Sequence, residues 1–427
     1  MKDRQHSRRD NGDERVIVSL DLGSKSIKAL MAIVEPDGSL TYLSGGEFPS
    51  AGIHEGMVSA PEQAESALAA ALNDLEAASQ TRILSAFVSV EGPHVRSQTA
   101  HGVTPIADEG HVISMQDVKL AIGSAREKIA RDQRSDHLHI IPSAYSIDGV
   151  SSVPDPVGMV GFELAVDACV ITAPLTVTHN LVRLLHAAGV EPDGLVAAPL
   201  AAAESVRGKG AAGLPVAVVD IGAQTSGLTI YAENALWQCD GLPIGGDTIT
   251  RSIAHKLRLP IDVAETLKRS HATCIPSSVG EEKMIEMEPI SGLDELLPMR
   301  LLAETAASGA QEIAGALLPL LERAQRQHLR PAMLLLTGGA AELDGLDTLL
   351  ASQLRIPVTV AHPSGVVGVR PELARPAFAV ATGLLLLGAR RQRRPTLRQR
   401  PASTPFLGEL RRIFGARGHG VAHPPRH

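Results

Sequence analysis

The stretch VVDIGAQT, residues 218–225, runs from apolar residues into an aspartate, a glycine and then polar residues. The stretch VSLDLGSKS, residues 18–26, repeats this pattern near the start of the chain. A β-branched apolar run predicts a buried strand, and Asp-x-Gly after it predicts a tight turn at the strand end. Because these two turns lie in different halves of the chain, they predict a duplicated α/β fold with Asp21 and Asp220 at equivalent positions.

The composition indicates more than one folded core. The chain has 427 residues, 44% of them hydrophobic and 20% charged, and at ~150 residues per domain this predicts two domains or more. A net charge of −7 argues against general nucleic-acid binding, which needs a basic face. The cysteines, Cys169, Cys239 and Cys274, have no metal-binding spacing and are predicted to be buried, reduced thiols.

No membrane-crossing segment is expected. The first residues are polar and lack the apolar core of a signal peptide. The longest apolar run, residues 376–389, is shorter than the ~20 residues of a spanning helix, so we predict a buried core helix there. The chain is therefore expected to be cytoplasmic.

Residues 15–92 predict a mixed sheet. Three strands, at 15–23, 27–35 and 40–48, form a meander, and a strand at 82–90 follows a helix over residues 61–79. Ser59 and Pro61 are expected to begin that helix.

The segment from about residue 93 to residue 170 is more polar and is interpreted as an inserted subdomain, with a serine-capped helix over 114–130. After a turn-rich hinge at 207–215 the strand meander repeats, with a turn at 232–235. An acidic loop at 280–295 and a long helix at 301–329 come next.

Four glycine turns, each after an apolar strand, predict a phosphate-binding site. Backbone N–H groups in such turns cradle phosphate oxygens, and a carboxylate beside them holds Mg²⁺ through water. Each turn alone is a common structural feature, whereas four in this order indicate a nucleotide clamp. The residues are Asp21, Gly23, Ser24 and Lys25 in the first turn, Asp220, Gly222 and Thr225 in the second, Gly245, Gly246 and Asp247 in the third, and Gly338 and Gly339 in the fourth.

From residue 15 to residue 388 the chain resembles the actin-like ATPase superfamily and, within it, the bacterial cell-division family FtsA. SLDLGSKSIKAL (19–30) and VVDIGAQTSGLTIY (218–231) are similar to its two phosphate loops, and LTGGAAELDGL (336–346) to its adenosine motif. The stretch VPDPVGMVG (153–161) resembles FtsA most specifically, and GIHEGMVSAPEQ (52–63) and LVRLLHAAGVEPDGLVAAPLAAAES (181–205) also match its pattern.

The resemblance implies an actin-like two-domain α/β fold with duplicated ribonuclease H-like mixed sheets, an inserted subdomain and a C-terminal amphipathic helix. It implies ATP and Mg²⁺ as ligands, and it places Glu265 and Lys268 against adenine and ribose. The expected segments are an N-terminal tail at 1–14, domain I at 15–92 and 169–210 with its return helix at 366–389, the inserted subdomain at 93–168, the domain II core at 211–250 and 331–365, its helical subdomain at 251–330, a basic linker at 390–405, the amphipathic helix at 406–418 and a tail at 419–427.

The C-terminal stretch PFLGELRRIFGARG independently suggests membrane binding. Its apolar residues recur on one helical face with arginines beside them, which is typical of a helix lying in an anionic membrane interface. A helix docked on the protein itself and a disordered tail are the alternatives. The residues concerned are Phe406, Leu407, Leu410, Arg411, Arg412, Ile413 and Phe414.

The second phosphate loop departs from the superfamily pattern Asp-x-Gly-Gly-Gly-Thr. Ala223 and Gln224 replace two glycines, and their Cβ atoms restrict how closely the backbone approaches a phosphate. Gln224 could supply an amide donor or crowd the site. Ala198 stands where hydrolysing relatives often carry an acidic residue, and Glu204 is interpreted as a solvated helix residue, so slow or absent ATP hydrolysis is expected.

By resemblance, the protein polymerises and tethers the tubulin-like FtsZ filament to the membrane at the division site. The FtsZ tail peptide is expected on the helical subdomain near Arg300 and Glu304, although a solvated arginine is an equal interpretation. Other division proteins are expected to bind the inserted subdomain. The alternatives are an actin-like pilus-assembly protein and, less favoured, a small-metabolite kinase of the same superfamily.

Overall fold

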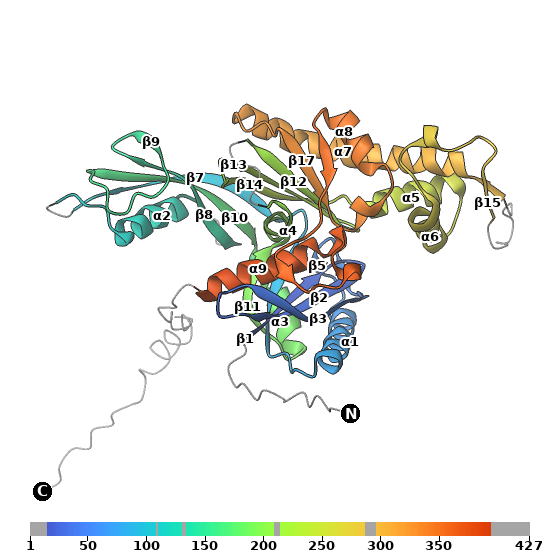
Figure 1. Ribbon diagram of the computed structural model, residues 1–427, viewed down its shortest axis with the longest axis horizontal. Helices are drawn as coiled ribbons and strands as arrows, with labels where there is room; N and C mark the ends of the chain where they lie inside the picture. Colours follow the sequence, from blue (N-terminus) through green and yellow to red (C-terminus); the bar gives the residue numbers. More distant parts are fainter. Residues whose placement is uncertain (1–14, 108–109, 130–133, 209–213, 287–295, 394–427) are drawn as a thin grey trace, which may run out of the picture. The chain divides into compact units, whose positions relative to one another are not determined.

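A six-stranded mixed sheet forms the base of domain I (Figure 1). The computed structural model describes residues 15–107, 110–129, 134–208, 214–286 and 296–393, and the side-chain contacts discussed below lie in the unit Met1–Ala389. The first three strands form an antiparallel meander, and the sheet is mixed, as predicted. Two further strands, one of them at residues 191–197 and not predicted from the sequence, run parallel to the first. In spatial order the strands are β11 (Glu191–Ala197), β6 (Ser85–Val90), β1 (Arg15–Leu22), β2 (Ser26–Val34), β3 (Leu40–Pro49) and β19 (Val366–Val367).

Four helices pack around this sheet: α1 (Pro61–Ser79), α3 (Leu175–Ala187), α4 (Ala198–Val206) and α9 (Ala379–Arg393). The first buries Ala64, Leu68, Ala71, Leu72 and Leu75, which recur at helical spacing, so its apolar face lies on the core. The predicted helix over residues 376–389 begins at Ala379, after two short 3₁₀ turns, Pro371–Leu373 and Pro376–Phe378.

The prediction that Ser59 caps α1 is wrong. The N-cap is Ala60, which makes no side-chain cap, and the Ser59 hydroxyl donates instead to the Gly52 carbonyl. Pro61 does occupy the first turn. The preceding hairpin explains the difference, because it directs the Ser59 side chain toward β4 (Ile53–His54) and β5 (Met57–Val58).

The inserted subdomain is a four-stranded antiparallel sheet with one helix, α2 (Met115–Ile129). The predicted serine cap is confirmed: the Asp117 N–H donates to the Ser114 hydroxyl oxygen at 3.4 Å, and the Asp117 carboxylate accepts in return from the Ser114 N–H at 2.8 Å. Its sheet order is β7 (Arg96–Pro105), β10 (Glu163–Pro174), β8 (Ser135–Ile147) and β9 (Val150–Val153).

Domain II repeats the topology of domain I, which confirms the duplication predicted from the two Asp-x-Gly turns. Three antiparallel strands are again followed by strands parallel to the first. The predicted turn at 232–235 joins the second and third strands, and its residues Glu233 and Asn234 both have positive φ. The order is β14 (Ala235–Leu242), β13 (Ser226–Ala232), β12 (Val216–Ile221), β17 (Met333–Thr337) and β18 (Val358–Val360).

The rest of domain II is mostly helical, with helices α5 (Gly246–Leu257), α6 (Ile261–His271), α7 (Met299–Arg326) and α8 (Leu346–Leu354) and 3₁₀ turns at Pro276–Ser278 and Gly339–Glu342. The expected acidic loop is partly strand, because β15 (Met284–Glu286) pairs with the antiparallel strand β16 (Leu296–Pro298). In each of these strands the middle residue is buried and the outer two are exposed. The long helix begins two residues earlier and ends three residues earlier than predicted.

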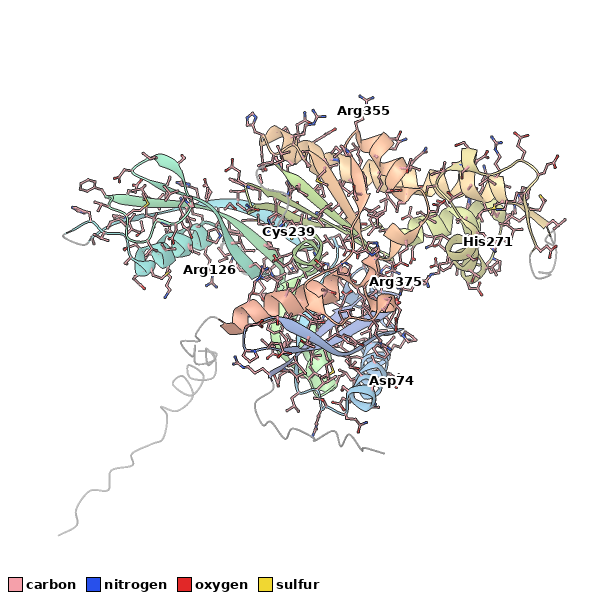
Figure 2. All side chains as sticks on the ribbon, in the orientation of Figure 1. Asp74, Arg126, Cys239, His271, Arg355 and Arg375 are labelled. Carbon is pink, nitrogen blue, oxygen red and sulfur yellow. The ribbon has the colours of Figure 1, made fainter. Side chains whose placement is uncertain are left out.

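The three cysteines are buried, as predicted. Figure 2 shows Cys239 within the mass of side chains, whereas Arg355, at the end of α8, points outward. No helix among the described residues is long and apolar enough to cross a membrane. The predicted amphipathic helix at 406–418 lies outside the described residues.

Candidate functional site

The first predicted phosphate turn follows β1, and its aspartate is buried. The Ser89 hydroxyl donates to the Asp21 carboxylate at 2.9 Å, and Lys28 lies opposite Asp21 in the β1–β2 ladder. Burial raises the pKa of Asp21, while Lys28 and the Ser89 hydrogen bond oppose that rise.

The second and fourth turns meet beside this carboxylate. Asp220 is the penultimate residue of β12, and burial together with the charge of Asp21 raises the pKa of Asp220 to about 7. Gly338, after β17, has a φ of 88°, and a Cβ there would lie 2.4 Å from the Asp220 Oδ1. Only glycine therefore fits at this point, and three of the four predicted turns lie together. Gly339 follows as the first residue of the 3₁₀ turn.

The third turn holds the second in place. The N–H groups of Gly246 and Asp247, at the start of α5, donate to the Gly222 and Ala223 carbonyls at 2.9 and 2.8 Å. A Cβ on Gly245 would lie 2.5 Å from the Ala223 carbonyl oxygen. The second phosphate loop is thus fixed by the helix that follows it.

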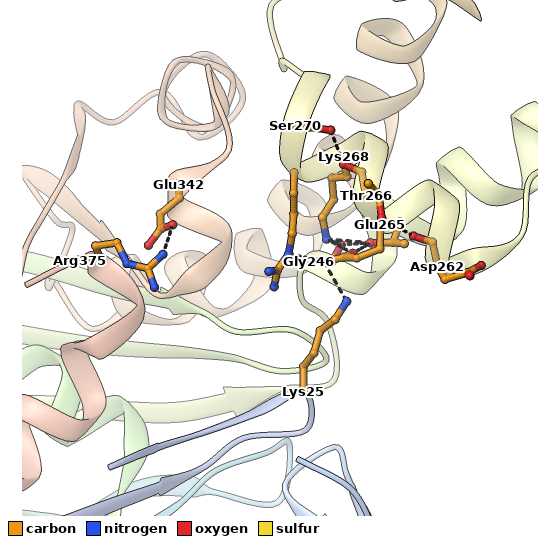
Figure 3. A network of polar contacts seen from close by, with 11 residues as sticks. Lys25, Gly246, Asp262, Glu265, Thr266, Lys268, Ser270, Glu342 and Arg375 are labelled. Carbon is orange, nitrogen blue, oxygen red and sulfur yellow. Dashed lines mark hydrogen bonds and ion pairs between the residues drawn. The ribbon is translucent and has the colours of Figure 1, made fainter. Parts of the chain in front are cut away.

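Glu265 and Lys268, on α6, join a polar network with the first phosphate loop (Figure 3). Lys25 Nζ lies 2.8 Å and Lys268 Nζ 2.7 Å from the Glu265 carboxylate, and the Thr250 hydroxyl donates to it at 2.5 Å. Burial opposes the ionisation of Glu265, but the hydrogen bonds from Lys25, Lys268 and Thr250 outweigh it and lower the pKa of Glu265 to about 2. Burial also lowers the pKa of Lys268.

Sequence reasoning missed two charged residues of this site. Glu91 follows β6, the parallel neighbour of β1; burial, with the charges of Asp21 and Asp220, raises its pKa to about 8. Lys28 lowers the pKa of all three carboxyl groups. The available signal for Lys28 was its position inside a mainly apolar strand, three residues after Lys25 of the first phosphate turn. Glu91 directly follows the last residue of β6, and Asp21 and Asp220 are the penultimate residues of β1 and β12. All three acidic residues therefore mark the end of a strand.

These residues suit a phosphate group. The Ser24 Oγ is buried and has no hydrogen-bond partner among the described residues, so a bound phosphate oxygen would satisfy it. Lys25 follows Ser24 in the chain, Lys28 supplies positive charge to the neighbouring carboxyl groups, and Thr225 lies buried at the second turn. Within the described ranges no group of three His, Cys, Asp or Glu residues is arranged to hold a metal directly.

The predicted partner residues on α7 are occupied by contacts within the chain. The Arg300 guanidinium pairs with Glu281 at 2.8 Å and with Glu304 at 3.4 Å, and all three side chains are exposed. Glu204, interpreted from the sequence as a solvated helix residue, lies on α4 and is partly buried, and its charge acts on Tyr231.

Comparison with known proteins identifies the family. The sequence profile for cell division protein FtsA matches residues 217–383, and the profile for the SHS2 domain inserted in FtsA matches residues 92–172. Cell division protein FtsA of Pseudomonas aeruginosa is 30% identical over 380 residues, covering 88% of this chain and 90% of that protein. The chain belongs to the FtsA family.

Other members and more distant structures agree with this assignment. FtsA of Escherichia coli K12 is 29% identical over 384 residues, covering 88% of this chain and 91% of that protein. A PilM–PilN type IV pilus biogenesis complex matches with a TM-score of 0.62 at 20% identity, covering 87% of this chain and 98% of that one. MreB5 of Spiroplasma citri bound to ADP matches with a TM-score of 0.50 at 14% identity, covering 89% and 99%. These structures show that the fold is actin-like. The FtsA profiles and relatives therefore support a cell-division protein over the pilus-assembly alternative.

The three carboxyl groups at the phosphate turns predict an unusual dependence of stability on pH. The pKa values of Glu91 and Asp220, about 8 and about 7, exceed their ordinary values, so the folded form holds protons that the unfolded form has released. The free energy of unfolding should therefore fall as pH rises from about 4 toward about 8, by at most about 1.4 kcal/mol per pH unit for each group.

Urea unfolding of the ligand-free protein at several pH values measures this slope. The substitution Glu91→Gln removes one titrating group and should flatten the slope between about pH 6 and pH 8. The exposed Glu62→Gln is the matched control and should leave it unchanged. Identical slopes for Glu91→Gln and the unsubstituted protein would contradict the raised pKa of Glu91. Both proteins retain Lys28, so its charge does not account for a difference between them.

Proposed function

We propose that this FtsA-family protein binds Mg²⁺-ATP in the cleft between its two domains. The buried, unpartnered Ser24 hydroxyl at the meeting point of the glycine turns is the observation that carries the proposal. Ser24, Lys25 and Lys28 would bind phosphate oxygens, and Glu265 and Lys268 would lie at the ribose and adenine. Asp21 and Asp220 would hold Mg²⁺ through water molecules. The ion would neutralise phosphate charge beside the acidic groups.

Slow hydrolysis is part of this proposal. Ala198, the first residue of α4, has no group to orient or deprotonate a water molecule. The Ala223 carbonyl accepts a hydrogen bond from the Asp247 N–H at the start of α5. This bond would restrict rearrangement of the second phosphate loop around a γ-phosphate. Nucleotide would then act chiefly as a signal for assembly.

We further propose that the protein polymerises and joins FtsZ filaments to the membrane surface at the division site. Membership of the FtsA family supports this role, as does the basic amphipathic sequence of residues 406–418. Several arginines at about 1 kcal/mol each and a few partly inserted apolar side chains give only weak binding to a single copy. A polymer would bind far more strongly through its many copies.

Sedimentation with vesicles tests the adaptor role. The full chain should pellet with vesicles containing anionic lipid, more strongly with ATP, and should bring FtsZ filaments with it. Deletion of residues 406–418 should return most of the protein to the supernatant. Replacement of Arg411 and Arg412 by lysine should keep the charge and the binding, because the attraction is mainly electrostatic.

Two outcomes would contradict the proposal separately. Equal pelleting after the deletion would show that residues 406–418 do not hold the protein on the membrane. Vesicle binding without FtsZ recruitment would remove the tethering role and favour an actin-like membrane protein of the pilus-assembly kind.

A further inference from the structure

We propose that Gln224 ties the two domains together across the nucleotide cleft, so that the cleft closes on a side-chain contact and does not depend on a bound phosphate. The Glu55 N–H, in domain I, donates to the Gln224 Oε1, in domain II, at 2.9 Å. The inference rests on the proposed function only in placing nucleotide in this cleft.

The domain I side of this contact is rigid. Glu55 and Gly56 form the two-residue turn between β4 and β5, with φ values of 48° and 77°. A Cβ on Gly56 would lie 2.2 Å from the Glu91 carbonyl oxygen, and one on Gly92 would lie 2.4 Å from the Glu55 carbonyl oxygen. The turn therefore interlocks with the segment after β6, which fixes the position of the Glu55 N–H.

The domain II side is equally fixed. Within the second phosphate loop the Gly222 N–H donates to the Thr225 carbonyl at 2.9 Å, and the Ala223 carbonyl is held by the start of α5. The backbone on both sides of Gln224 is thus constrained, and the half-buried glutamine side chain spans the remaining gap to domain I. A glycine at this position, as in the superfamily pattern, has no side chain with which to make the contact.

Two ionic contacts also cross between the domains, but their physical character differs. Lys25 of domain I pairs with Glu265 of domain II, and Arg375 of domain I pairs with Glu342 of domain II at 3.0 Å. Arg375 also pairs with Glu47 inside domain I at 3.2 Å. Figure 3 shows Lys25 and Arg375 reaching separate carboxylates. The Lys25 and Arg375 side chains are more than a third exposed, so salt screens these pairs. The amide contact of Gln224 carries no net charge and should persist at high salt.

Hydrogen exchange of the Glu55 amide tests the contact directly, in the nucleotide-free protein at about 1 M salt, where the ionic pairs are screened. Gln224→Met keeps the length of the side chain and removes the acceptor. It should increase exchange at Glu55 by about five- to ten-fold. Gln353→Met, at an exposed glutamine of α8, is the matched control and should change nothing.

A second measurement follows the domains themselves. Spin labels at the exposed positions Asp74 of α1 and Ser352 of α8 should give a narrow distance distribution in the unsubstituted protein without nucleotide. Gln224→Met and Gln224→Gly should broaden it toward longer distances. Unchanged Glu55 exchange and an unchanged distance distribution in Gln224→Gly would overturn the inference.

Nucleotide binding separates this inference from the proposed function. A fluorescent ATP analogue should bind both the unsubstituted protein and Gln224→Met, and should enter the substituted protein faster because its cleft opens more often. If neither protein binds the analogue, the proposed nucleotide binding is refuted. Hydrogen exchange at Glu55 still shows whether Gln224 joins the two domains. If both bind it at equal rates and exchange at Glu55 is equal, only the tie is refuted.

Discussion

Replacing Gly383 by alanine should lower the free energy of unfolding by about 3 kcal/mol. Gly383 is buried in α9, and a Cβ there would lie 1.7 Å from the Ala201 carbonyl oxygen of α4. The obstructing atom belongs to a helix backbone, so no side chain can rotate away and the two helices must separate. This contact forms part of the core that packs α9 against α4 and the domain I sheet.

The same substitution at Gly315 is the control, and it should act in the opposite direction. Gly315 is exposed on α7, and a Cβ there would meet nothing within 4 Å. Alanine is a better helix former than glycine, so Gly315→Ala should raise the free energy of unfolding by about 0.5 to 1 kcal/mol. Urea unfolding of both variants measures the pair, and destabilisation of equal size at the two sites would contradict this packing of α9.

Asp240→Asn should be the second strongly destabilising change, by about 2 to 3 kcal/mol. The Asp240 carboxylate is fully buried and accepts hydrogen bonds from the Ser97 N–H at 2.9 Å, the Gln238 amide at 2.9 Å and the Arg323 guanidinium. Asparagine keeps the volume but loses the charge, and it leaves donors facing its own amide group. The expected loss of unfolding free energy is smaller than for a fully buried ion pair, because the Arg323 side chain is 38% exposed.

This carboxylate joins three parts of the chain, namely β7 of the inserted subdomain, β14 of domain II and α7. Asp240→Asn should therefore also speed hydrogen exchange at the N–H groups of Ser97 and Cys239, which hydrogen-bond across this joint. Arg300→Met removes an exposed ion pair of α7 and should cost less than about 1 kcal/mol. Equal losses for the two variants would show that Asp240 has no special structural role.

The sequence predicted the fold and much of the site because both depend on local patterns. An apolar strand followed by Asp-x-Gly is recognisable within eight residues, and its recurrence predicted the duplication that the two sheets display. The sequence failed where a partner distant along the chain decides the role of a residue. In the sequence Glu91 is an ordinary polar residue after a strand. Its role follows only from the parallel pairing of β6 with β1, which the sequence does not show.

Gln224 is the clearest example of this limit. Its replacement of a glycine was visible, but the sequence left open whether it donates to a ligand or crowds the site. Its observed contact is to Glu55, 169 residues earlier in the chain. The wrong cap at Ser59 has a local origin, because the carbonyl of Gly52, in the preceding hairpin, accepts a hydrogen bond from its hydroxyl.

The buried cysteines also make the protein convenient for labelling chemistry. Burial raises the pKa of Cys169 and Cys274 to about 12 and raises that of Cys239 as well, so almost no reactive thiolate exists near neutral pH. A cysteine introduced at an exposed position should react with a maleimide while the three native thiols remain intact. Dyes and spin probes can then be attached one site at a time in an otherwise unaltered polypeptide.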